Sequence, residues 1–322
     1  MENKSIELFP IHRVWILSIF LVIPFVLAVG LWDHFFNNSG LLPYLGISAI
    51  FLPLYVLVFE TPHIIASFVG FVDKEYVRHY RRHLVLGIPL MAISFLCLVW
   101  FDFTIAVGIY LAVTMYHVIR QQTGIALMFG IMKSKWHSYW SWFLVINTTI
   151  VYISLILPGI ITSFISSFIL ILVVITLVLA LICSGGLIYQ TDSRQGICYI
   201  LLTMAMVATG YLMLWFGYIF LAVFVVRFVH DITAFLFYIT HEVNRNKEQI
   251  KNSLYKAVPL IPFSLIIIVP LFAIFIGLLI RESIPSAENT FVVLMLFGFI
   301  HYYLESIMWK SSSPHRKQVK IV

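Results

Sequence analysis

Apolar runs of about 20 residues recur along the whole chain, and they limit its fold more than any other feature. A helix of that length crosses the hydrocarbon core of a bilayer, whereas the strands of a membrane barrel alternate apolar and polar residues. These runs do not alternate, and 61% of the 322 residues are hydrophobic while only 11% are charged. The chain is therefore predicted to be an all-α, polytopic integral membrane bundle, with one multipass domain over residues 1–322.

About ten transmembrane helices fit these runs. The second run contains Pro53 and Pro62, so its helix is expected to kink or break there. The first run lacks a short apolar core with a cleavage site and is interpreted as a retained span. The predicted spans cover about residues 14–32, 42–71, 84–100, 103–132, 138–158, 160–189, 196–215, 218–242, 258–280 and 290–309.

With ten spans, the basic residues fall almost entirely in loops on one side, and the opposite loops carry only Arg281. Such an excess of Lys and Arg marks cytoplasmic loops, so both termini are expected to be cytoplasmic. In a bacterium this would be the inner membrane. The net charge of +6 is thus explained by orientation and does not imply a nucleic-acid partner. The three cysteines form no CxxC pair, so neither disulfides nor thiolate ligands are inferred.

Seven of the eleven histidines lie in the predicted cytoplasmic halves of spans or just beyond them, and several have a carboxylate, Gln or second His about one helical turn away. An ionisable residue in a membrane segment costs at least ~2.5 kcal/mol, so a group of them at one depth indicates function. The arrangement predicts a metal centre toward the cytoplasmic side. The candidate ligands are Glu60, His63, His79, His83, His117, His230, Asp231, His241, His301 and Glu305.

Residues 73–84 are predicted to form an amphipathic helix in the membrane interface. At 100° per residue, His79 and His83 share one face with Tyr76 and Tyr80, and the basic residues take the opposite face. Two histidines one turn apart can bind one metal ion. Four other residues are expected to support the ligands without binding the metal, namely Arg120, Gln121, Arg227 and Tyr238.

Imidazole and carboxylate groups together suit iron, manganese, zinc or copper, and this many candidates fit two ions, or one ion and its surrounding shell. The His79-x-x-x-His83 spacing and the membrane layout resemble the histidine-rich membrane di-iron fatty-acid desaturase and hydroxylase superfamily. The tail HYYLESIMWK also resembles uncharacterised bacterial multipass membrane proteins. The first resemblance implies two iron ions, oxidation of a lipid-like substrate with dioxygen, and a separate electron-donor protein.

Four alternatives remain open from the sequence. A metal or proton transporter would need polar residues through both halves of the membrane, and the outer halves are nearly bare of them. Facing histidines such as His117 and His230 could instead ligate a b-type haem. An interfacial metal-dependent hydrolase would use zinc and a general base. A non-catalytic sensor or scaffold is the fourth reading.

Overall fold

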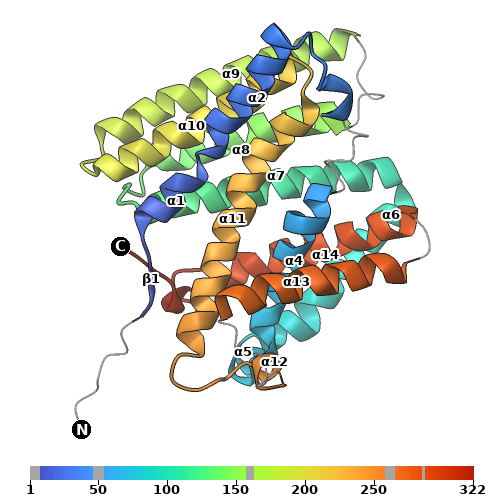
Figure 1. Ribbon diagram of the computed structural model, residues 1–322, viewed down its shortest axis with the longest axis vertical. Helices are drawn as coiled ribbons and strands as arrows, with labels where there is room; N and C mark the ends of the chain where they lie inside the picture. Colours follow the sequence, from blue (N-terminus) through green and yellow to red (C-terminus); the bar gives the residue numbers. More distant parts are fainter. Residues whose placement is uncertain (1–7, 46–53, 157–162, 258–264, 285–286) are drawn as a thin grey trace. The chain divides into compact units, whose positions relative to one another are not determined.

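The computed structural model describes residues 8–45, 54–156, 163–257, 265–284 and 287–322, and this part of the chain is almost entirely helical (Figure 1). The predicted all-α class is thereby confirmed. Within the described residues, seven helices are long and apolar enough to cross a membrane. The total number of spans and the side of the membrane on which the termini lie remain predictions. The seven are Arg13–Phe36, His83–Phe101, Phe103–Met128, Phe168–Tyr189, Arg194–Trp215, Ile219–Arg245 and Asn289–Met308.

The other three predicted spans fall on helices that are shorter or less apolar, which are α8 and the segments Val56–Val72 and Pro270–Ile280. Pro53 and parts of the predicted spans 42–71, 138–158, 160–189 and 258–280 lie outside the described residues. The α-helices are α1 (Arg13–Ile19), α2 (Val22–Phe36), α4 (Thr61–Val69), α5 (Lys74–His79), α6 (Ile88–Phe101), α7 (Phe103–Met128), α8 (Lys135–Ile156), α9 (Ser163–Tyr189), α10 (Arg194–Trp215), α11 (Ile219–Arg245), α12 (Ser253–Ala257), α13 (Leu265–Ser283) and α14 (Ala287–Met308). The remaining elements are the short helices η1 (Leu42–Tyr44), η2 (Val56–Glu60), η3 (Gly70–Val72), η4 (His83–Gly87) and η6 (Arg316–Gln318) and the strands β1 (Pro10–Ile11) and β2 (Lys320–Ile321).

Local sequence signals account for several helix ends. The side chain of Asp102 accepts a hydrogen bond from the backbone N–H of Ile105 and so caps the start of α7. Ser193 caps α10 in the same way through the N–H of Gly196. At the other end of α7, Gly130 has a φ of +85°, a conformation that favours glycine and that ends helices.

The chain forms two compact units. Unit 1 comprises Met1–Ile16, Pro53–Cys97 and Asp231–Val322, and unit 2 comprises Leu17–Leu52 and Leu98–His230. The helices α1, α6 and α11 each contribute residues to both units. The two units are described separately below.

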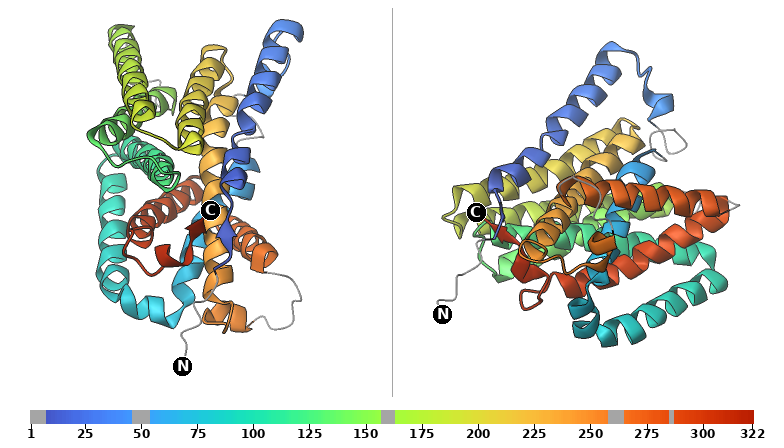
Figure 2. Two further views of the ribbon diagram at one scale, coloured as in Figure 1. Left: turned by 90° about the vertical axis from the view of Figure 1, so that its left-hand side faces the viewer. Right: turned by 60° about the horizontal axis from the view of Figure 1, so that its bottom comes forward.

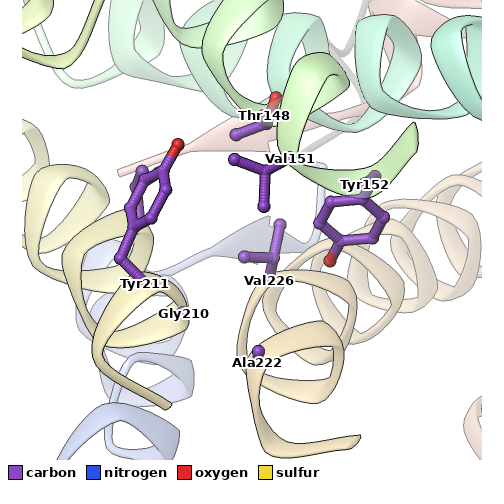
Figure 3. Close-up of a pocket in the computed structure, with 8 residues that line it drawn as sticks. Thr148, Val151, Tyr152, Gly210, Tyr211, Ala222 and Val226 are labelled. Carbon is purple, nitrogen blue, oxygen red and sulfur yellow. The ribbon is translucent and has the colours of Figure 1, made fainter. Parts of the chain in front are cut away.

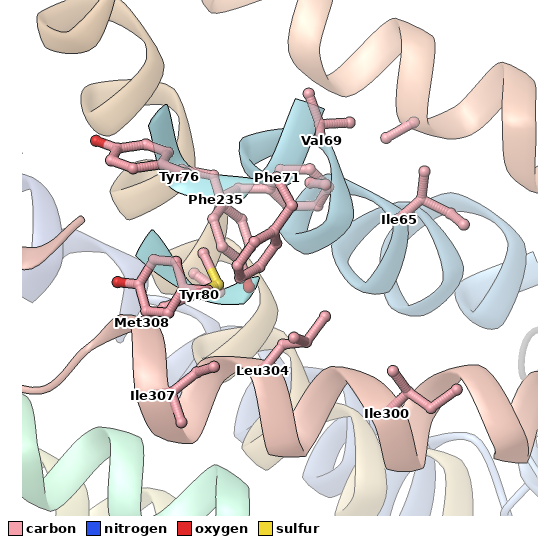
Figure 4. Close-up of a cluster of buried hydrophobic side chains, with 14 of the residues drawn as sticks. Ile65, Val69, Phe71, Tyr76, Tyr80, Phe235, Ile300, Leu304, Ile307 and Met308 are labelled. Atoms are coloured by element: carbon pink, nitrogen blue, oxygen red, sulfur yellow. The ribbon is translucent and has the colours of Figure 1, made fainter. Parts of the chain in front are cut away.

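In unit 1, α4 packs against α13 and α14 (Figure 1). A cluster of buried hydrophobic side chains joins α4, α5, the unit-1 part of α11, and α14 (Figure 4). Ile300 and Leu304 contribute to it from α14, and Phe235 and Tyr238 contribute from α11. This cluster fixes the helices that carry the candidate ligands.

The two ends of the described chain also meet in unit 1. Strands β1 and β2 pair in parallel, with Pro10 opposite Lys320. The amide of Asn244 on α11 joins both, because its Nδ2 donates to the backbone oxygens of Phe9 and Gln318. The polar end of α11 thus secures both terminal segments.

In unit 2, α8 packs against α7 and α9 (Figure 2). The buried Asn147 of α8 donates to the backbone oxygen of Val173 and to Thr176 of α9, and it accepts a hydrogen bond from Tyr211 of α10. A small cavity of about 20 Å³ lies among α8, α10 and α11, with Tyr152 and Tyr211 beside it (Figure 3). A space of that size holds about one water molecule, so it is too small for a substrate.

Two segments of unit 1 depart from regular helix geometry next to candidate ligands. Pro62 lies in the first turn of α4, and because proline has no N–H to donate, the preceding turn widens into the π-helix η2, which ends at Glu60. The predicted interfacial helix 73–84 is also divided, since α5 ends at His79 and η4 begins at His83.

Candidate metal centre

Two helices of unit 1 bring His63, His301 and Glu305 together. His63 lies on α4, and His301 and Glu305 lie one turn apart on α14. Each offers one ligand atom, and these three atoms lie within 4.8 Å of one another. All three side chains are buried, with exposed fractions of 2%, 0% and 3%. Two imidazoles and a carboxylate from the predicted ligands therefore converge inside the unit.

The hydrogen bonds of His63 determine which of its nitrogens can bind a metal. Its Nδ1 lies 2.7 Å from Oδ1 of Asp231 on α11, and Oδ2 of the same carboxylate accepts from the hydroxyl of the buried Tyr55. A carboxylate accepts hydrogen bonds, so Nδ1 of His63 carries the proton and Nε2 carries the lone pair. Asp231 thus orients a histidine as carboxylates do behind metal-bound imidazoles.

His301 is set in the same tautomer by a serine. The hydroxyl of Ser67 donates to the backbone oxygen of Ile64 at 2.6 Å, so its single proton is already used. Nδ1 of His301 lies 2.8 Å from Ser67 Oγ and must therefore be the donor in that contact. The lone pair of His301 is consequently on Nε2, as it is in His63.

The third member, Glu305, is held by a tyrosine. Tyr238 on α11 is buried and donates its hydroxyl proton to Oε1 of Glu305. A carboxylate has two oxygens, so Oε2 can serve as a ligand while Oε1 accepts this hydrogen bond. Tyr238, which the sequence analysis expects to support the ligands, thus hydrogen-bonds to the candidate ligand Glu305.

The ring spacing fits two histidines bound to adjacent positions of one ion. The ring centroids of His63 and His301 are 4.6 Å apart, and the ring planes meet at 81°. With metal–nitrogen bonds of about 2.1 Å, imidazoles at right angles around an ion have centroids about 4.5 Å apart, and imidazoles on opposite sides about 6.4 Å apart. The residues present therefore fit a bound transition-metal ion with the two histidines side by side.

Unit 2 contains a second pair of candidate ligands. His117 on α7 and His230 on α11 are buried, with ring centroids 4.9 Å apart and planes at 84°. This spacing also fits adjacent coordination positions and is shorter than a pair of axial haem ligands needs. Arg227 is buried one turn before His230.

Other predicted ligands lie elsewhere in unit 1. His79 and His83 are exposed, and the structure instead buries Tyr76 and Tyr80 from the same predicted face. The α-helix α5 ends at His79 and a π-helical turn begins at His83, so the segment is not the single regular helix that a 100° wheel assumes. His83 donates to or accepts from the hydroxyl of Tyr303 at 2.7 Å.

Glu60 and His241 also lie apart from the group of three among the described residues. Glu60 is half-buried at the end of η2. Both ring nitrogens of His241 contact protein groups, since Nε2 lies 3.0 Å from the Tyr76 hydroxyl and Nδ1 lies 3.1 Å from Glu242. Its ring stacks on His315 with centroids 4.6 Å apart.

The remaining supporting residues predicted from the sequence lie in unit 2. Arg120 is exposed, and its guanidinium donates to the hydroxyl of Ser141 at 3.0 Å. Gln121 is half-buried, whereas its neighbour Gln122 is buried and accepts a hydrogen bond from Tyr199.

Sequence reasoning missed three residues that contribute to these polar clusters, namely Tyr55, Ser67 and His315. Tyr55 and Ser67 look like ordinary residues of an apolar run, and only the packing shows that they bond to Asp231 and His301. His315 follows the last helix in a polar tail, yet it is fully buried against Tyr76, with ring centroids 3.9 Å apart. The sequence contains no local signal for either placement.

Comparisons with models of protein families, with curated proteins and with solved structures found no match to this chain.

Proposed function

We propose that this chain is a membrane-embedded, metal-dependent oxidoreductase that oxidises a lipid-like substrate. The observation that carries the proposal is the convergence of three ligand atoms in unit 1, from His63, His301 and Glu305, within 4.8 Å of one another. The hydrogen bonds of Asp231 and Ser67 to Nδ1 place the lone pairs of both histidines on Nε2, which is the nitrogen that would bind the metal. A buried group of this kind inside apolar helices indicates function because it is costly to maintain otherwise.

Iron(II) is the metal that we propose for unit 1. Two histidines and one carboxylate on adjacent positions form the ligand set of non-haem iron oxygenases, which keep further positions open. Three protein ligands suffice for one ion, so we propose one iron in unit 1 rather than the two that the desaturase-like resemblance implies. A bound iron(II) ion would supply the redox chemistry that activates dioxygen.

The proposed reaction inserts one oxygen atom of dioxygen into a C–H bond of the substrate and reduces the other to water. This consumes two electrons and two protons, and we propose that a separate donor protein supplies the electrons. The substrate would enter from the bilayer, whose apolar interior surrounds helices of this composition. The predicted orientation would put the site toward the cytoplasmic leaflet.

The residues around the site have distinct parts in this proposal. Asp231 keeps the His63 ring in one tautomer and orientation, and Ser67 does so for His301. Tyr238 fixes one oxygen of Glu305. Both carboxylates thus accept hydrogen bonds at the proposed site, Asp231 from His63 and Glu305 from Tyr238.

Metal content of the detergent-purified chain, measured by mass spectrometry together with an optical spectrum, tests the proposal. We expect about one iron per unit-1 site and no haem band. This iron should be lost in each of three variants, His63→Ala, His301→Ala and Glu305→Gln. The control is His83→Ala, which should keep the iron, because His83 is an exposed histidine of the same unit that is hydrogen-bonded to a tyrosine. Incubation with lipid, a chemical reductant and isotopically labelled dioxygen should then label the product. Full iron content in all three variants would refute the site.

A metal-dependent hydrolase is the second candidate, and the ligand set is the specific reason. Two histidines and one glutamate also bind catalytic zinc, with water in the fourth position. Zinc in the purified chain, lost in the same three variants, together with release of fatty acid from an ester lipid, would favour this reading. Labelled oxygen from water rather than from dioxygen would then appear in the product.

A further inference from the structure

Two aromatic residues, Tyr238 and Trp309, lie next to each other beside the proposed metal site. Tyr238 donates its hydroxyl to Glu305, and its ring centroid lies 5.8 Å from that of Trp309. Trp309 directly follows α14 and is half-buried, and its backbone N–H donates to the backbone oxygen of Glu305. A tyrosine and a tryptophan thus lie in series between a ligand and the end of the helix that carries it.

We propose that Tyr238 and Trp309 form a one-electron relay that carries an oxidising equivalent from the site to the end of α14. This inference rests on the proposed function, because dioxygen chemistry at the site is the source of the oxidising equivalent. The relay protects the site when no substrate is bound. A soluble one-electron reductant restores Trp309 at the end of the path.

The electrons and protons of each step balance. The oxidised site takes one electron from Tyr238, and the hydroxyl proton of Tyr238 moves along the existing hydrogen bond to Oε1 of Glu305. The neutral tyrosyl radical takes one electron from Trp309, and the proton returns from Glu305 to the tyrosine oxygen. Trp309, now oxidised by one electron, is reduced by the soluble reductant.

A second tyrosine–tryptophan pair shows what distinguishes this one. Tyr116 and Trp142 in unit 2 have the same centroid separation, 5.8 Å, and nearly the same ring angle, 42° against 40°. Tyr116 is 42% exposed and lies beside the cation of Arg120. Among the described residues no carboxylate accepts a hydrogen bond from the Tyr116 hydroxyl. The two pairs therefore share the same ring spacing, but only Tyr238 has a carboxylate as its proton acceptor. This pair is the internal control.

The relay can be tested without metal, which separates its failure from failure of the proposed function. The full-length chain in detergent is stripped with a chelator, and tryptophans are oxidised by flash photolysis with ruthenium tris-bipyridine and an irreversible electron acceptor. Low-temperature electron paramagnetic resonance then records the radicals. We expect a tyrosyl radical in the wild-type chain, lost in Tyr238→Phe and in Trp309→Phe and retained in Trp142→Phe.

Two further variants guard against a merely structural effect. Trp309→Tyr keeps an oxidisable ring and should restore the radical, and Glu305→Gln removes the proton acceptor and should suppress it while leaving Trp309 oxidisable. Each variant must elute from size exclusion like the wild type. A tyrosyl signal that is unchanged in Tyr238→Phe or Trp309→Phe would overturn the relay. Metal binding measured on the same preparations reports on the proposed function independently.

Discussion

The position of Asp231 leads to a quantitative prediction about metal affinity. Its carboxylate accepts from His63 Nδ1 at 2.7 Å and from the hydroxyl of Tyr55. Asp231→Asn leaves one carbonyl oxygen for these two donors and turns an NH₂ group toward one of them. Loss of such a partner behind a metal-bound histidine costs about 10- to 100-fold in affinity, or about 1.4 to 2.8 kcal/mol.

The assay is an anaerobic iron(II) titration against a competing chelator, on detergent-purified protein. Tyr55→Phe in the Asp231→Asn background removes the donor that conflicts with the amide, so the double variant should recover part of the lost affinity. Asp33→Asn is the matched control, because Asp33 is a fully buried carboxylate of unit 2 that accepts from Tyr218 at 2.7 Å. The Asp33→Asn variant should have a lower free energy of unfolding and an unchanged affinity for iron(II).

Two results would refute this reasoning about Asp231. Affinity within about threefold of wild type in Asp231→Asn would mean that the carboxylate does not orient His63. A loss as complete as that of His63→Ala, with no recovery in the double variant, would mean that Asp231 binds the metal itself.

Three further predictions concern other parts of the chain. Ser67→Ala removes the acceptor for His301 Nδ1 and should weaken iron(II) binding about tenfold in the same titration. Burial, with the nearby cationic groups, lowers the pKa of His315 from 6.5 to about 2, so the unfolded chain binds a proton below pH 6.5 that the folded chain does not. The free energy of unfolding should therefore fall as the pH falls below 6.5, by at most about 1.4 kcal/mol per pH unit, and His315→Gln should flatten this slope in denaturation curves. Gly186→Ala would put a Cβ 2.7 Å from the ring of Trp136, and should destabilise the α8–α9 packing by about 1 to 3 kcal/mol in the same unfolding assay.

The helical class could be predicted because it depends on a repeated, local property of the sequence. Each apolar run of about 20 residues favours a helix by itself, whatever its neighbours do. The predicted break near Pro62 was equally local, since it follows from a missing N–H, although its form as a π-helical turn was not foreseen.

The ligand positions of the candidate site could be predicted in part. The sequence alone determined that His301 and Glu305 share one face of a helix, because residues four apart always do. It could not determine that this face meets His63, because that depends on how α14 packs against α4. Helical periodicity also could not tell the buried His301 from the exposed His79.

Only the tertiary structure decided how each candidate is used. Asp231 and Tyr238 lie on the same helix, α11, but Asp231 hydrogen-bonds to a histidine and Tyr238 hydrogen-bonds to a glutamate. Ser67 carried no sequence signal at all, because a hydroxyl in an apolar run reads as an ordinary small residue. Hydrogen bonds form between side chains on different helices, and their geometry follows from rotamers and packing that no single segment specifies.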